Sequence, residues 1–243
     1  MAQTILVTSG KGGVGKSSSC VFLGYSLASQ GKRVLIVELD AGLRGLDIML
    51  GVENKTVYDM GDILLGRCDP YDAVVSSDYQ QGLSLLPAPT DHWEELQQGD
   101  ILWLIKAIAD YYDYILMDSP AGFGKGFRIG AAAAELALLV VTPDPVCVRD
   151  GYLASVALEQ RGVKRQRLLI NRVRQQYVKS ELPDLDTVID QTGVQLIGVV
   201  PEDIWVMKAA ARGVPLPSGS KALPAYQNIA KRLLGQYCPL AVG

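Results

Sequence analysis

The chain of 243 residues contains a single histidine, four cysteines and no excess of positive charge. The cysteines lie far apart and none belongs to a Cys-x-x-Cys pair, so their spacing predicts neither a zinc nor an iron–sulfur site. His92 lies between Asp91 and Trp93, which is typical of a surface residue at a helix start rather than of a catalytic base. A net charge of −3 and a pI near 5.3 argue against a surface built mainly for nucleic acid.

Long hydrophobic runs are also absent. The longest apolar stretch, residues 131–141, contains Glu135 and is too short to span a bilayer. The N-terminus leads directly into a β-like run, so no secretory signal peptide is predicted. We therefore expect a cytoplasmic protein with free thiols, in which Cys20 and Cys147 belong to the core. The composition, 49% apolar and 20% charged, is that of a globular protein, and we expect one domain over residues 1–243.

The most informative feature present is a glycine-rich run, Gly10-Lys11-Gly12-Gly13-Val14-Gly15-Lys16-Ser17. It fits Gly-x4-Gly-Lys-[Ser/Thr], follows a β-like run and precedes a helical one, as in loops that wrap nucleotide phosphates. The glycines let the backbone approach phosphate oxygens, and the N–H groups form an anion-binding nest at a helix start. We expect Lys16 to reach the β- and γ-phosphates and Ser17 to ligate Mg2+. Ser18 completes the predicted loop. A glycine-rich turn that binds nothing is the alternative.

Two strand-end acids fit the same chemistry. Asp118 follows the apolar run 115–117, and from this strand end it can reach the metal held by Ser17. Without the glycine-rich loop elsewhere in the chain, Asp118 would be interpreted as a turn residue. Asp40 closes a second strand and can orient the attacking water or hold a metal-bound water. Glu38 is expected on the same side of that strand as Asp40, by period-two alternation.

Strand-like and helical segments alternate along the chain. Strands are predicted near residues 3–8, 33–39, 83–86, 114–118, 136–142, 166–171 and 195–200. Helices are predicted near 16–30, 95–111, 147–161, 184–192, 203–212 and 222–235. This order predicts an α/β fold, a three-layer, doubly wound, mostly parallel sheet with helices on both faces. The first helix is expected to bury one face, and the last to dock through Tyr226, Ile229 and Ala230. Ligand is expected at the carboxyl ends of the strands.

The looser pattern Lys-Gly-Gly-x-Gly-Lys-[Ser/Thr], at residues 11–17, resembles the deviant Walker-A ATPases of the MinD/ParA family. Stretches similar to the MinD branch also occur at residues 40–47, 118–122, 148–150 and 198–203. The resemblance implies an ATP/ADP- and Mg2+-binding hydrolase that forms an ATP-dependent homodimer, with Lys11 crossing to the partner's phosphates and Asp40 positioning the water. It also implies a regulatory partner of the MinC or MinE type.

By the same resemblance, Asp150 belongs to the dimer face, Asn171 and Arg172 hold the adenine, and Pro201 with Asp203 lies on its other side. Read alone, Asn171 is more typical of a strand-end turn. The chain also departs from the MinD pattern. Glu38 stands in place of the usual Asp, Gly45 in place of Asn, and Phe123-Gly124 in place of an Ile-Glu pair. These departures affect the expected geometry of the segments that respond to the nucleotide, and the expected hydrolysis rate. They do not affect the expected nucleotide binding.

Four functions remain open at this point. The first is a MinD-like ATPase switch in division-site placement. The second is a ParA-like DNA or cargo partitioning ATPase, for which a basic cluster at residues 161–179 is a candidate surface, although a solvated helix end and loop is the simpler interpretation. The third is a redox carrier, which the cysteine spacing disfavours, and the fourth is a slow or inactive nucleotide-gated scaffold. Residues 236–243 carry no basic side chain, so we expect weak or absent autonomous membrane binding and a peripheral position only through a partner.

Overall fold

A computed structural model describes residues 2–41, 44–91, 93–174 and 184–240. The expectations about His92 and about residues 42–43, 175–183 and 241–243 lie outside this part of the chain. The described residues form one eight-stranded sheet in the order β3-β4-β2-β5-β1-β6-β7-β8. Its strands are β1 (Gln3–Thr8), β2 (Val34–Glu38), β3 (Val75–Ser76), β4 (Leu83–Leu86), β5 (Tyr114–Asp118), β6 (Leu136–Val141), β7 (Gln166–Val173) and β8 (Leu196–Pro201). Only β3 is antiparallel to its neighbour, β4.

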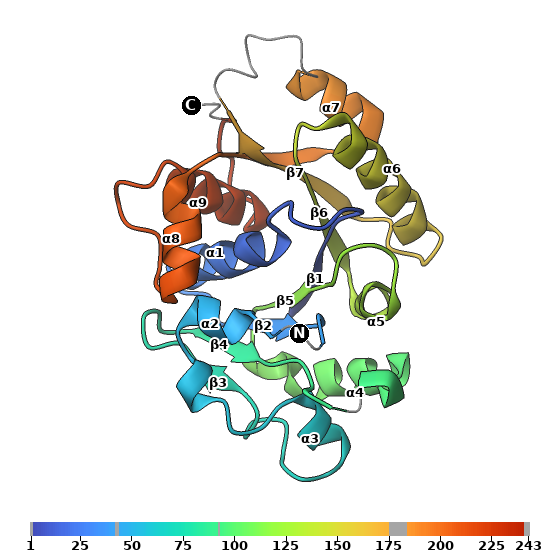
Figure 1. Cartoon of the computed structure of the whole chain (residues 1–243), viewed down its shortest axis with the longest axis vertical. Coiled ribbons are helices and arrows are strands. Elements are labelled where there is room, and N and C mark those ends of the chain that lie inside the picture. The colour runs from blue at the N-terminus through green and yellow to red at the C-terminus, as the bar shows by residue number, and fades with distance from the viewer. Residues whose placement is uncertain (1, 42–43, 92, 175–183, 241–243) are drawn as a thin grey trace.

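Helices cover both faces of this sheet. They are α1 (Lys16–Ala28), α2 (Leu46–Leu50), α3 (Met60–Leu64), α4 (Gln98–Ile108), α5 (Lys125–Ala133), α6 (Pro145–Glu159), α7 (Leu185–Thr192), α8 (Ile204–Arg212) and α9 (Ala222–Leu233), with single 3-10 turns at Glu53–Lys55, Trp93–Glu95 and Ala109–Tyr111. In Figure 1, α1, α2, α8 and α9 lie on one side of the sheet and α4, α5, α6 and α7 on the other. The predicted three-layer, doubly wound fold is confirmed. Two apolar clusters form the core: one includes residues of α1 and α9 and also of α6 and α7, and the other lies mainly against α4 and α5.

The prediction of a single buried face on α1 is wrong. Every residue from Ser19 to Ala28 is buried, because α9 packs on the side of α1 that faces away from the sheet. The predicted docking of α9 is confirmed, since Tyr226, Ile229 and Ala230 are fully buried. The hydroxyl of Tyr226 lies 3.3 Å from Oγ of Ser19, which joins the two helices inside the core.

Helix α5 was not predicted, because its glycines lower helix propensity. Packing explains their presence. A Cβ on Gly126 would lie 2.6 Å from the carbonyl oxygen of Leu39, and one on Gly130 would lie 2.5 Å from Cδ1 of Leu6. Glycine therefore lets α5 approach the sheet more closely than any other residue could. The short elements α2, α3 and β3 were also missed, because they are too short to show a period.

The chain order places the glycine-rich loop at a topological switch point. Strand β1 lies between β5 and β6, so the chain leaves β1 toward one half of the sheet and later returns to build the other. Open parallel sheets bind ligands at such a point, beyond the carboxyl ends of the strands.

Candidate nucleotide site

The glycine-rich loop between β1 and α1 has a backbone that requires glycine at several positions. Gly13 and Gly15 have φ values of 76° and 91°, in the left-handed region that other residues rarely adopt. A Cβ on Gly10 would lie 2.2 Å from the backbone oxygen of Asp150, so the start of the loop packs directly against α6. The hydroxyl of Ser9 donates to the carbonyl of Lys11 over 2.6 Å, which holds the turn closed.

Asn171, in β7, braces the loop from the other side. Its Nδ2 donates a 2.8 Å hydrogen bond to the carbonyl of Val14, and its side chain lies so close to Gly15 that a Cβ there would be 2.3 Å from Nδ2. This bond uses one of the two N–H groups of the amide. The expected contact between Asn171 and adenine stays a prediction. The brace to Val14 was not predicted, since no local sequence signal reports it.

Lys16, the first residue of α1, lies near two carboxyl groups at strand ends, those of Asp118 and Asp40. Lys16 is only 8% exposed and Asp118 only 1%. Burial raises the pKa of Asp118 to about 7, while the Ser17 hydroxyl and the Lys16 ammonium act in the opposite direction. Burial also raises the pKa of Asp40, again opposed by Lys16.

The oxygen atoms at this end of the sheet fit a magnesium–nucleotide complex. Oδ1 of Asp118 is buried and has no hydrogen-bond partner among the described residues, and the Ser17 hydroxyl interacts with the same side chain. Hard oxygen donors of this kind suit Mg2+. Within residues 2–41, 44–91, 93–174 and 184–240, no group of three His, Cys, Asp or Glu side chains could hold a metal alone. A metal here would therefore need further ligands, such as phosphate oxygens or water.

Lys11 lies outside this buried group. Its side chain is 44% exposed, and Nζ lies 3.3 Å from Oδ1 of Asp144. Asp144 caps α6 by accepting a hydrogen bond from the N–H of Cys147. This hydrogen bond, and to a smaller extent the contact with Lys11, lowers the pKa of the Asp144 carboxyl. An exposed ion pair of this kind contributes roughly 0–1 kcal/mol, so Lys11 can leave Asp144 at little cost.

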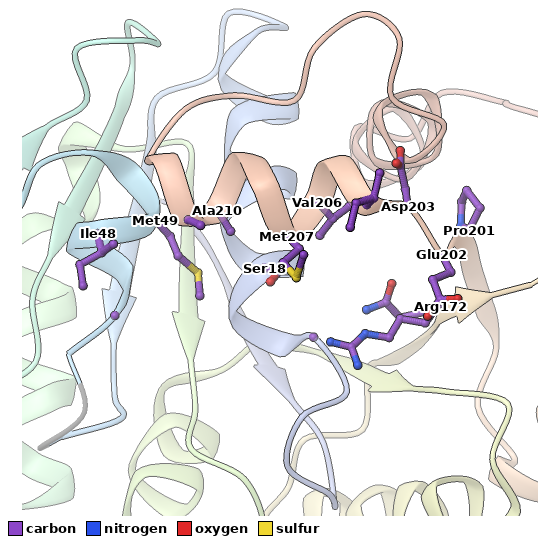
Figure 2. A pocket seen from close by; sticks show the side chains of 15 residues that line it. Ser18, Ile48, Met49, Arg172, Pro201, Glu202, Asp203, Val206, Met207 and Ala210 are labelled. Atoms are coloured by element: carbon purple, nitrogen blue, oxygen red, sulfur yellow. The ribbon is translucent and has the colours of Figure 1, made fainter.

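A pocket of about 830 Å³ opens beside the loop. Figure 2 shows α8 along one side of it, with Val206, Met207 and Ala210 on that helix, and Ile48 and Met49 at one end. Its full lining is Gly15, Ser18, Gly45, Ile48, Met49, Asn171, Arg172, Pro201, Glu202, Asp203, Ile204, Val206, Met207, Ala210 and Ala211. All four residues expected around adenine (Asn171, Arg172, Pro201 and Asp203) therefore lie on one pocket. The walls from α2 and α8 were not predicted.

Two of these residues also have structural partners. The Asp203 carboxylate accepts from the N–H of Trp205 over 2.9 Å and from the hydroxyl of Ser220 over 2.7 Å, so it joins the starts of α8 and α9. Arg172 has a φ of 55°, in the left-handed region, at the pocket edge. The predicted nucleotide contacts of Arg172, Pro201 and Asp203 stay predictions.

The basic cluster does not form one patch. Arg161 and Lys164 precede β7, whereas Arg172 and Arg174 lie near its carboxyl end, roughly 20 Å away at the rise of an extended strand. Arg161 donates to the carbonyl of Ala157 and lies over the Phe127 ring, and Arg174 pairs with Glu202. Lys179 lies outside the described residues.

A mostly parallel sheet with a glycine-rich loop at its switch point, a buried lysine followed by a half-buried serine, and strand-end acids defines a P-loop nucleotide-binding protein. The nucleotide-binding domain family CobQ/CobB/MinD/ParA matches residues 5–216. The septum site-determining protein MinD of Bacillus subtilis is 37% identical over 248 residues, covering 100% of this chain and 92% of the relative. The chain belongs to the MinD/ParA family.

Solved structures agree with this assignment. MinD in the MinC:MinD complex of Aquifex aeolicus has a TM-score of 0.92 at 36% identity, with 99% of each chain covered. The Mg-ADP complex of MinD from Pyrococcus horikoshii has a TM-score of 0.86 at 28% identity, with 96% of each chain covered.

The described helices include none with the length and apolar content needed to cross a membrane. Cys20 and Cys147 are buried, as predicted.

Proposed function

We propose that this chain is an Mg2+-dependent ATPase that works as a nucleotide-gated dimerisation switch in division-site placement, as its MinD relatives suggest. The observation that carries the proposal is the arrangement at the end of the sheet. Lys16, at the end of the glycine-rich loop, is buried and interacts with Asp118 and Asp40, whereas Lys11 in the same loop is exposed and paired with Asp144.

The loop and Lys16 bind and orient the substrate. Backbone N–H groups at the start of α1 receive the phosphate oxygens of ATP, and the Lys16 ammonium neutralises charge on the β- and γ-phosphates. Because Lys16 is buried, its charge is screened less by solvent than that of a surface lysine. The base lies in the pocket between α8 and the end of β7.

Ser17 and Asp118, with Asp40, are the residues that would hold Mg2+, which when bound supplies positive charge at the phosphates. Asp40 orients a water molecule toward the γ-phosphorus. The water oxygen forms a bond to phosphorus, the bond to the β–γ bridging oxygen breaks, and ADP and phosphate leave. Water loses its proton to a phosphate oxygen or to Asp40, whose pKa is raised by burial.

Dimerisation follows from Lys11. Its weak pairing with Asp144 leaves it free to reach the phosphates of a second copy, where a desolvated interface strengthens the attraction between the ammonium and the γ-phosphate. Hydrolysis removes that phosphate and the attraction with it, so the dimer is expected to separate.

Sedimentation velocity with variants that block hydrolysis tests this proposal. Asp40→Ala should be a dimer with Mg-ATP and a monomer with Mg-ADP. Adding Lys11→Ala should leave Mg-ATP binding intact by calorimetry and abolish the dimer. Adding Lys55→Ala instead is the matched control, because Lys55 is also an exposed lysine paired with an aspartate, Asp78. A dimer that persists without Lys11, or Mg-ATP binding that survives Lys16→Ala, contradicts the proposal.

The partners follow from the same relationship. The Aquifex aeolicus complex contains MinC and MinD, so we infer a regulator of the MinC type for this chain. ParA-like binding of DNA is the alternative, and the division of the basic residues between the two ends of β7 does not favour it.

A further inference from the structure

Helix α4 and the loop that follows α3 share an exposed aromatic surface. Trp103 on α4 is 54% exposed, Tyr111 in the 3-10 turn after α4 is 57% exposed, and Tyr71 in the loop is 45% exposed. The rings of Tyr71 and Tyr111 meet edge to face with their centroids 4.7 Å apart, and the Tyr71 hydroxyl donates to the carbonyl of Ala107 over 3.2 Å. Trp103 lies one helical turn before Ala107, on the same side of α4. We call Tyr71, Trp103, Ala107 and Tyr111 the aromatic face.

The aromatic face lies in the most acidic part of the chain. Residues 59–113, from α3 to the start of β5, contain eleven Asp and Glu but only two Lys and Arg, whereas the whole chain contains 26 and 23. Partial burial, the contact with Tyr111 and the charge of Asp110 raise the pKa of Tyr71 to about 12, so Asp110 lies near the two rings. Burial raises the pKa of the Cys68 thiol in the same loop, and four aspartates raise it further: Asp62, Asp72, Asp69 and Asp59. The field over this face is therefore negative, while the rest of the chain has more basic than acidic residues.

The sign of this field decides which class of molecule the face fits. Nucleic acids and anionic lipid headgroups carry negative charge, so this surface repels them. Ammonium and guanidinium groups are attracted both by carboxylates and by the faces of tyrosine and tryptophan rings. Exposed rings of this kind are also enriched in protein–protein interfaces. Charge complementarity thus favours a cationic protein segment as the occupant.

The aromatic face is remote from the nucleotide site. Tyr111 lies just before the first residue of β5, whereas Asp118 is the last residue of that strand, and a strand of this length spans roughly 13 Å. In Figure 1, α3 and α4 lie at the end of the molecule away from α6, the helix against which the glycine-rich loop packs. A segment bound on the aromatic face would therefore leave the loop and Lys11 uncovered.

We propose that the aromatic face is a docking surface for a cationic segment of a partner protein, one that carries lysine or arginine side chains interspersed with apolar residues. The cationic groups lie over the rings of Tyr71, Trp103 and Tyr111 and pair with Asp110 and the aspartates of the loop. The apolar side chains pack around Ala107. Because this surface is separate from the nucleotide site, the partner is expected to bind with or without nucleotide, and the inference does not depend on the proposed ATPase function.

Fluorescence anisotropy with two labelled synthetic peptides tests this surface. One peptide alternates pairs of leucine and lysine, and the other has glutamate in place of lysine. The lysine peptide should bind with a Kd below about 1 mM and more weakly as salt rises, and the glutamate peptide should not bind. Saturating Mg-ADP should change the Kd of the lysine peptide less than about twofold, because the two sites are separate.

Two substitutions on the face have matched controls elsewhere. Trp103→Ala and Asp110→Lys should each weaken binding of the lysine peptide at least about fivefold. The controls are Tyr152→Ala, a half-exposed aromatic residue on α6, and Asp190→Lys, an exposed acid on α7 whose reversal changes the net charge equally. Each control should change the Kd less than about twofold. All four variants should keep the Mg-ADP affinity of the wild type, which shows that they are folded.

Hydrogen exchange on the wild type locates the peptide without any substitution. The lysine peptide should slow exchange within residues 65–72 and 98–111. Absence of binding, protection confined to other segments, or equal losses in the control variants overturns the inference. Sedimentation without nucleotide should show a monomer. Self-association that Asp110→Lys removes would identify a second copy of this chain as the occupant and would overturn the assignment to a partner protein.

Discussion

Replacing Asp118 by asparagine is expected to stabilise the nucleotide-free protein at alkaline pH. The carboxyl is 1% exposed, has a buried oxygen without a partner, and has a pKa raised from 3.8 to about 7, chiefly by burial. A pKa that is higher in the folded than in the unfolded protein means that folding takes up a proton between these values. The free energy of unfolding therefore falls as pH rises from about 4 to about 7.

The size of this effect follows from the shift. A difference of about three pKa units at 1.36 kcal/mol each corresponds to about 4 kcal/mol of destabilisation above pH 7, fading below pH 4. Asparagine has a similar shape and no charge to desolvate. For a chain of this length, 4 kcal/mol corresponds to roughly 10 °C in melting temperature.

Thermal melts of wild type and Asp118→Asn from pH 4 to pH 8.5 measure the difference. The variant should melt higher at pH 8, with the gap closing toward pH 4. Asp113→Asn is the opposite control, because side-chain and backbone hydrogen bonds with Arg33 lower the pKa of Asp113. Its carboxylate stabilises the fold above pH 4, so that variant should melt lower than wild type at pH 8. The deficit should disappear as pH falls through the lowered pKa.

Nucleotide reverses the ranking at Asp118. Saturating Mg-ADP should raise the melting temperature of wild type more than that of Asp118→Asn, because the variant lacks the anionic oxygen that would face the metal. A gap between the nucleotide-free proteins that is independent of pH, or that favours wild type at pH 8, would show that Asp118 is not a desolvated carboxylate with one unpaired oxygen. That result would remove the structural argument for its metal role.

Two further substitutions test the packing around the site. Gly126→Ala should lower the free energy of unfolding in urea by about 1–3 kcal/mol, because the methyl group would lie 2.6 Å from the carbonyl of Leu39. Gly99→Ala, on α4 with open space around it, should instead stabilise by about 0.5–1 kcal/mol, and equal effects would contradict the packing explanation. Asn171→Ala should cost about 1–3 kcal/mol and weaken Mg-ADP binding, since it leaves the Val14 carbonyl unpaired. Unchanged affinity by calorimetry would mean that the loop does not need this brace.

The sequence predicted those parts of the protein whose cause is local. The glycine-rich loop is recognisable because the Gly and Lys positions must be contiguous to surround phosphate. The alternation of strands and helices was also readable, because each long element repeats its apolar residues with its own period. Asp40 and Asp118 could be placed at the same end of the sheet because parallel strands share their carboxyl edge.

The tertiary structure decided what depends on residues far apart in the chain. Asn171 braces Val14 across 157 positions, and Lys11 meets Asp144 across 133, and neither pairing leaves a local pattern. Helix α5 was hidden because its glycines, which weaken a helix in isolation, are required by close packing on the sheet. The three backbone N–H groups that donate to the Glu38 carboxylate and the pocket wall on α2 were equally unreadable, since a strand-end carboxylate acquires its partners only when separate segments fold against it.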